Sequence, residues 1–126
     1  MFGEVVATML VVAVGLVHLV PGVVALAPRR AAVVYGTKVR DRDLELLLRH
    51  RAVLLTLVGV GLIVGAFVSS TRAVTMTAGV LSTGSFVALS VAVGWGNLNS
   101  RTRRVAQVDV AALAALAVAA GLFVVV

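Results

Sequence analysis

The sequence predicts an all-α membrane protein, a single four-transmembrane-helix bundle over residues 1–126 with both termini on the outer side (N-out/C-out). Of the 126 residues 61% are hydrophobic and only 13% are charged, about half the charged fraction of a soluble domain. Four predominantly apolar stretches each supply the roughly 20 residues that cross the hydrocarbon core. The basic residues cluster around two of the three connectors.

The first span covers about 5–27. The run at 25–27 resembles a signal-peptide cleavage site, but Glu4 and no basic residue precede the span, whereas a signal peptide begins with a positive region. Pro28 would also directly follow the cut. We therefore expect a retained helix, bent near Pro21 because proline removes a backbone hydrogen bond.

The other spans cover about 44–68, 73–94 and 105–126, which leaves connectors at 28–43 and 95–104. In the first connector a short apolar run ends in Tyr35. This run lies either along the membrane interface or in a solvated loop with a turn at the next residue, Gly36.

Orientation follows from the basic residues. Seven lie in or beside connector 28–43 and three in connector 95–104, and Arg72, between the second and third spans, is the remaining one. The positive-inside rule puts both basic connectors in the cytoplasm. Arginine outnumbers lysine ten to one, a bias typical of GC-rich bacterial genes, so we expect a multi-pass protein of the bacterial inner (cytoplasmic) membrane.

Small residues mark the expected contact faces, because helices in lipid associate through close approach and polar contacts. We expect this packing within the chain ahead of dimerisation. The stripes comprise Gly15, His18 and Gly22; Gly59, Gly61 and Gly65; Thr75, Gly79, Ser82 and Ser85; and Ala112, Ala115 and Ala119.

Ionisable groups inside a membrane are costly and therefore mark candidate sites. His18 and Asp109 lie within spans, and a charged cluster opens the second span, where a Glu45–Arg49 pair four residues apart can form on one helix face. We expect Arg49 to point into the bundle. The candidate residues are His18, Glu45, Arg49, His50, Arg51, Ser85 and Asp109.

Two interpretations of these residues stay open. In the first, Asp109 pairs with Arg49 or Arg51, which leaves no uncompensated charge in the apolar layer, while His18 hydrogen-bonds Ser85. In the second, the same groups line a polar pocket open to the cytoplasm that binds an anionic head group or relays a proton through His18.

Composition excludes several chemistries. Without cysteine there are no disulfides, thiolate metal sites or thiol nucleophiles. The two histidines lie at different depths, so we expect no haem, no metal site and no other cofactor. The basic residues flank apolar spans, where they set topology and contact anionic lipid, so we expect no nucleic-acid partner.

The pair Tyr35-Gly36 and the run Asp43 to Leu54, with Arg49-His50-Arg51, resemble a family of small bacterial four-span membrane proteins with a DoxX-like appearance. Asp109, early in the fourth span, also matches. The resemblance implies the topology but no function. Some relatives carry the label phosphopantetheine adenylyltransferase. The sequence does not support that label, because it has neither a Rossmann-like domain nor a histidine-glycine-histidine nucleotide motif.

Three functions follow from this pattern. The leading one is a non-enzymatic accessory or scaffolding protein that packs against lipids and against a second copy of itself or a larger membrane protein. The alternative is binding or transport of a small amphiphile or lipid in the cytoplasm-facing pocket. The third is a membrane enzyme acting on lipid or quinone through His18 and Asp109.

Overall fold

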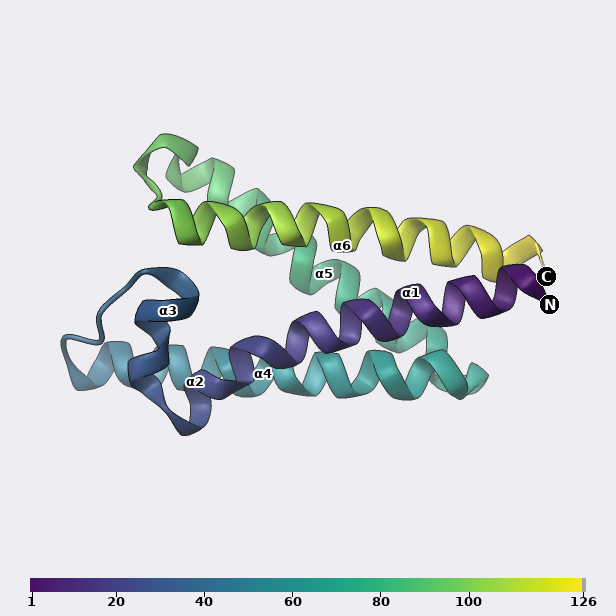
Figure 1. Cartoon of the computed structure of the whole chain (residues 1–126), viewed down its shortest axis with the longest axis horizontal. Helices are drawn as coiled ribbons and strands as arrows, with labels where there is room; N and C mark the ends of the chain where they lie inside the picture. Colours follow the sequence, from purple (N-terminus) through teal and green to yellow (C-terminus); the bar gives the residue numbers. More distant parts are fainter. Residues whose placement is uncertain (126) are drawn as a thin grey trace.

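The computed structural model describes residues 1–125, and this part of the chain forms a bundle of four long helices without strands (Figure 1). The four segments long and apolar enough to cross a membrane are Phe2–Leu26, Arg42–Phe67, Ser69–Val93 and Ser100–Val125. The first begins with α1 (Phe2–Leu19), and the other three are α4, α5 and α6. The prediction of an all-α four-helix bundle is confirmed.

Helix α1 packs against α4 and α6, and α5 packs against the same two helices. Both termini lie at one end of the bundle, and the α5–α6 connector lies at the other (Figure 1). We call the part with the termini and the α4–α5 turn the terminal half. The arginine-rich half contains α2, α3 and the α5–α6 connector. Helices α1 and α6 are close in the terminal half and diverge toward the arginine-rich half (Figure 1).

A chain of short elements fills the arginine-rich half: η1 (Val20–Gly22), α2 (Val23–Leu26), η2 (Pro28–Arg30) and α3 (Ala31–Tyr35). Near Pro21, where the sequence predicts a bend, the α-helix gives way to the 3₁₀ turn η1.

Helix α3 ends at Gly36, whose φ of +66° is the left-handed conformation that glycine adopts without strain. A turn at Gly36 is therefore present, but the run before it is a helix and not the solvated loop considered as one alternative. Ala31 and Tyr35 are buried, and α3 packs against α6. The segment that connects the first two spans thus folds back onto the bundle.

Helices α4 and α5 are joined by one residue, Val68. The third helix therefore begins at Ser69, four residues before its predicted span. The side chain of Arg72 makes this turn tight, because it donates to the carbonyl oxygens of Gly65 (3.2 Å) and Ala66 (3.3 Å). Such carbonyls at the end of a helix lack a partner within it. Arg72 also lies 3.9 Å from the ring centroid of Phe123 on α6.

Two other polar side chains define helix starts. The carboxylate of Asp41 accepts a hydrogen bond from the Leu44 backbone N–H (2.7 Å) and caps α4. The side-chain oxygen of Asn99 accepts one from the Thr102 backbone N–H (2.9 Å). Residues 100–104, expected in the connector, are therefore the first turns of α6.

The apolar core lies mainly in the terminal half and is built from α1, α4, α5 and α6 around Val11, Leu62 and Leu116. Close approach of α1 and α4 requires glycine, because a Cβ on Gly59 would lie 2.7 Å from the Gly15 carbonyl oxygen. A second, smaller core in the arginine-rich half contains Val24, Ala31, Tyr35 and Ala52.

Candidate functional site

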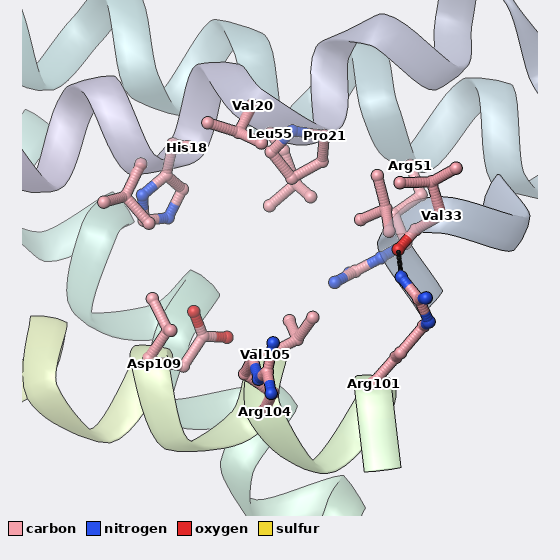
Figure 2. A pocket seen from close by; sticks show the side chains of 13 residues that line it. His18, Val20, Pro21, Val33, Arg51, Leu55, Arg101, Arg104, Val105 and Asp109 are labelled. Atoms are coloured by element: carbon pink, nitrogen blue, oxygen red, sulfur yellow. Dashed lines mark hydrogen bonds between the residues drawn. The ribbon is translucent and has the colours of Figure 1, made fainter. Parts of the chain in front are cut away.

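A cavity of about 440 Å³ lies where α1 and α6 diverge (Figure 2). Its walls come from α1, η1, α3, α4 and α6. Five of its lining residues are ionisable, namely His18, Arg51, Arg101, Arg104 and Asp109. The others are apolar: Val17, Val20, Pro21, Val33, Val34, Leu55, Val105 and Val108.

Arg51 of α4 is held at one side of this cavity. Its Nε donates to the hydroxyl oxygen of Tyr35 (3.2 Å), and its guanidinium lies 4.7 Å from the ring centroid of Phe86 and 5.5 Å from that of Tyr35. Aromatic faces attract a guanidinium. The two terminal nitrogens make no hydrogen bond within residues 1–125, and Figure 2 shows the guanidinium directed into the cavity. Arg51 is thus an oriented donor.

Two more arginines come from the first turns of α6. Arg101 donates from Nη1 to the Val33 carbonyl oxygen (2.7 Å), so it joins α6 to α3 at the cavity edge (Figure 2). The side chain of Arg104 lines the cavity and has no hydrogen bond or ion pair within the described chain. Both side chains are exposed.

His18 is 4% exposed, and both of its ring nitrogens have partners. Nδ1 lies 2.9 Å from the Val14 carbonyl oxygen and Nε2 lies 3.2 Å from the Ser82 hydroxyl oxygen. These contacts fit a neutral ring that donates to the carbonyl through Nδ1–H and accepts from the serine at Nε2. His18 is therefore held in place as a link between α1 and α5.

The predicted His18–Ser85 bond is wrong, because Ser82 is the partner and Ser85 is exposed. The prediction counted residues along one straight helix from 5 to 27. Residues Val20–Gly22 form the 3₁₀ turn η1, whose rise per residue is larger than that of an α-helix, so the count does not give the depth of His18.

Asp109 of α6 faces His18 across the cavity (Figure 2). Within residues 1–125 its carboxylate has no hydrogen bond and no ion pair; the two ion pairs found there are both made by Glu45. The predicted pairing of Asp109 with Arg49 or Arg51 is therefore wrong. Arg51 instead donates to Tyr35, and the carboxylate is left facing the cavity.

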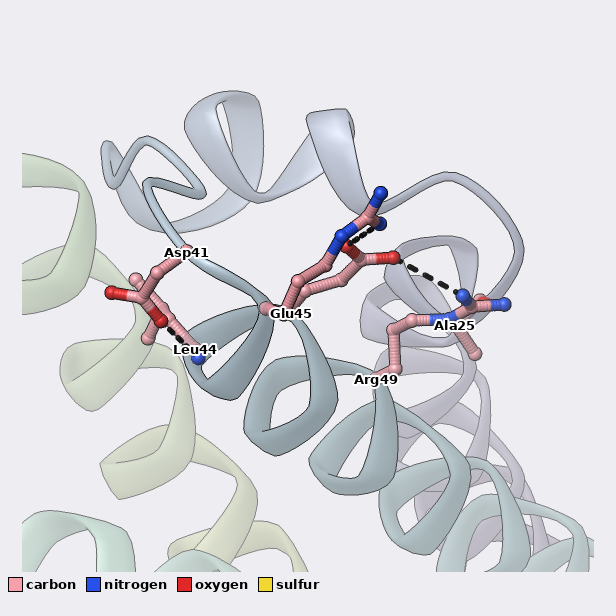
Figure 3. A network of polar contacts seen from close by, with 6 residues as sticks. Ala25, Asp41, Leu44, Glu45 and Arg49 are labelled. Atoms are coloured by element: carbon pink, nitrogen blue, oxygen red, sulfur yellow. Dashed lines mark hydrogen bonds and ion pairs between the residues drawn. The ribbon is translucent and has the colours of Figure 1, made fainter.

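Arg49 points away from the bundle interior, contrary to expectation. Its Nε donates to the Ala25 carbonyl oxygen (2.9 Å) and its Nη1 lies 3.3 Å from Glu45 (Figure 3). Glu45 also pairs with Arg42 (2.8 Å). The predicted Glu45–Arg49 pair is confirmed, but it ties α2 to the outer face of α4.

His50 and Ser85 line a different groove, between α4 and α5, of about 590 Å³. Arg51 and Leu55 border both this groove and the cavity. Of the seven residues predicted for the site, the structure brings together His18, Arg51 and Asp109. Glu45, Arg49, His50 and Ser85 do not line this cavity, although His50 and Ser85 share the groove with Arg51.

Sequence reasoning treated Arg101 and Arg104 as determinants of topology and missed them as site residues. The spacing of Arg101 and Arg104 relative to Asp109 could have identified them. Arg101, Arg104, Val105, Val108 and Asp109 follow an i, i+3, i+4, i+7, i+8 pattern, which places them on one helix face.

In the described chain no group of three His, Asp or Glu side chains is close enough to hold a metal ion. What the cavity offers is three guanidinium groups and one carboxylate against apolar walls. Such a surface can bind an anionic group through charge-assisted hydrogen bonds and an attached apolar chain through burial.

Comparison of the chain with protein-family models, with curated proteins and with solved structures gives no match.

Proposed function

We propose that this protein binds a small amphiphile with an anionic head group in the cavity between α1 and α6, in the bacterial inner membrane. The observation that carries the proposal is the combination of three arginines with apolar walls in one cavity of about 440 Å³. That volume lies within the roughly 300–1,000 Å³ range of small-molecule sites.

The location of the basic residues supports a cytoplasmic position for the arginine-rich half. Arg101 and Arg104 begin α6, and Arg29 and Arg30 lie in η2 at the same end of the bundle. Arginine near the end of a span favours the cytoplasmic side, so an amphiphile would enter from the inner leaflet. This is the orientation expected from the sequence, with both termini outside.

Binding is favoured over a proton relay through His18, because Nδ1 is bonded to the Val14 backbone carbonyl, which cannot pass a proton on. The accessory or scaffolding function, with a second copy or a larger membrane protein as partner, stays a prediction. So does a membrane enzyme acting on lipid or quinone. The cavity is the specific observation that puts amphiphile binding first.

Native mass spectrometry of the protein in a neutral detergent tests the proposal, with methyl dodecyl phosphate as the anionic probe. Val108 lines the cavity and is 40% exposed, so Val108→Trp should fill the space and weaken binding about tenfold. The matched control is Val110→Trp, because Val110 lies on the same helix, is 52% exposed and is outside the cavity lining.

The wild type and Val110→Trp should each bind one probe molecule. A wild type that binds neither this diester nor the monoester dodecyl phosphate, or equal binding of the diester by the two tryptophan variants, would contradict the proposal.

A further inference from the structure

From the charges around the cavity we infer that its preferred ligand is a phosphomonoester carried on a single apolar chain. This inference rests on the proposed binding function and narrows it to one class of head group.

The charge balance of the lining points to a dianion. Arg51, Arg101 and Arg104 contribute three positive charges and Asp109 one negative charge, while the contacts of His18 fit the neutral ring. Two positive charges are left over. A phosphomonoester carries about −1.5 to −2 at pH 7, whereas a phosphodiester or a carboxylate carries only one negative charge.

The arrangement of donors agrees with the charge. The terminal nitrogens of Arg51 and the whole guanidinium of Arg104 have no hydrogen-bond partner within residues 1–125. Arg101 uses one nitrogen for the Val33 carbonyl. A monoester presents three terminal oxygens, and arginine can bind such oxygens in pairs.

The lining also provides an apolar wall for an attached chain. It includes Val17 and Val20 of α1 and η1, and Val105 and Val108 of α6. The single chain of a monoester can follow this wall while its phosphate group binds the arginines.

The experiment compares dodecyl phosphate with methyl dodecyl phosphate, which has the same chain but one charge fewer, by quantitative native mass spectrometry at pH 8. We expect the wild type to prefer the monoester about tenfold, equivalent to about 1.4 kcal/mol. Arg104→Gln should reduce this preference to about threefold or less.

Arg103→Gln is the matched control and should keep the full preference. It removes the same charge from the neighbouring residue of α6, and Arg103 is outside the cavity lining.

Titration gives a test on the unmodified protein. The second pKa of a phosphomonoester is about 6, so at pH 5 the monoester loses its second charge and the preference should disappear. The groups that face the head group are His18 from α1, Arg51 from α4, and Arg101, Arg104 and Asp109 from α6. Methyl dodecyl phosphate has no second ionisable proton. Any change in its affinity between pH 8 and pH 5 therefore reports the titration of these protein groups.

The outcomes distinguish a failure of the phosphomonoester inference from a failure of the proposed function. If neither probe binds, the proposed function fails. Equal binding of the two probes at pH 8, or a preference that survives at pH 5, overturns the phosphomonoester alone. Glycerol 3-phosphate should not displace dodecyl phosphate at equal concentration. Displacement by it would show a site for soluble phosphates and overturn the requirement for a chain.

Discussion

In the terminal half the long helices touch directly through small and aliphatic side chains, whereas in the arginine-rich half α2 packs against α4 and α3 packs against α6. Gly15 and Gly59 bring α1 and α4 into backbone contact, and Leu62 and Leu116 fill the core around them. In the other half, α3 is joined to its neighbours by hydrogen bonds from Arg51, Asn99, Arg101 and Thr102.

The comparison of the two halves indicates where a small membrane protein has room for a charged binding site. Close packing in lipid gains from small residues, and the apolar core of the terminal half contains no charged side chain among the described residues. Helix α3 packs against α6 where α1 and α6 diverge, and the cavity with its arginines lies there (Figure 1).

The largest expected loss of stability comes from adding a single methyl group in the terminal half. In Gly59→Ala the new Cβ would lie 2.7 Å from the Gly15 carbonyl oxygen and 3.0 Å from the His18 Cβ. Backbone atoms cannot yield as side chains do, so we expect the free energy of unfolding to fall by about 2–3 kcal/mol. Reversible unfolding in mixed micelles measures this.

Gly121→Ala is the control for the same substitution. No heavy atom lies within 4 Å of a Cβ at Gly121 on α6. Alanine is the better helix former, so this variant should be neutral or more stable by up to about 1 kcal/mol. Equal effects at Gly59 and Gly121 would show that α1 and α4 are not in glycine-mediated contact.

An intermediate loss of stability is expected where the α5–α6 connector is hydrogen-bonded to α3. The side-chain amide of Asn99 donates to the Tyr35 carbonyl oxygen (2.8 Å), and its oxygen caps α6. Asn99→Ala should therefore cost about 1–2 kcal/mol. Hydrogen–deuterium exchange should become faster in residues 28–41 and stay unchanged in α5.

Asn97→Ala tests the specificity of that effect in the same connector. Asn97 is exposed, and its side chain donates only to the Val93 carbonyl oxygen, one turn back. Exchange in residues 28–41 should match the wild type. If both variants accelerate it alike, the docking of α3 does not depend on Asn99.

The four spans could be predicted because their apolar stretches are long enough to need lipid on their own, whatever their neighbours do. The exact ends of the helices could not be predicted from the sequence. Helix α5 starts early because Arg72 reaches back to two carbonyls of α4, and α6 starts early because of the Asn99 cap. Both depend on how the chain turns in space.

The site was predictable only in part, for a geometric reason. Arg49 and Arg51 are two positions apart on a helix with 3.6 residues per turn, so they point in nearly opposite directions. The sequence shows that one of them can face α6 but not which one. The structure assigns Arg51 to the cavity and Arg49 to the outer face beside Glu45.

The smallest expected loss of stability comes from removing the hydrogen bond that links α1 and α5 beside the cavity. Ser82→Ala removes the hydroxyl next to Nε2 of His18. Interhelical hydrogen bonds of this kind contribute on average about 0.6 kcal/mol in membrane proteins, so we expect a stability loss of that size by thermal unfolding in detergent. Ser85→Ala removes an exposed hydroxyl bonded only within α5 and should change stability less. The reverse order of the two losses would restore Ser85 as the partner of His18.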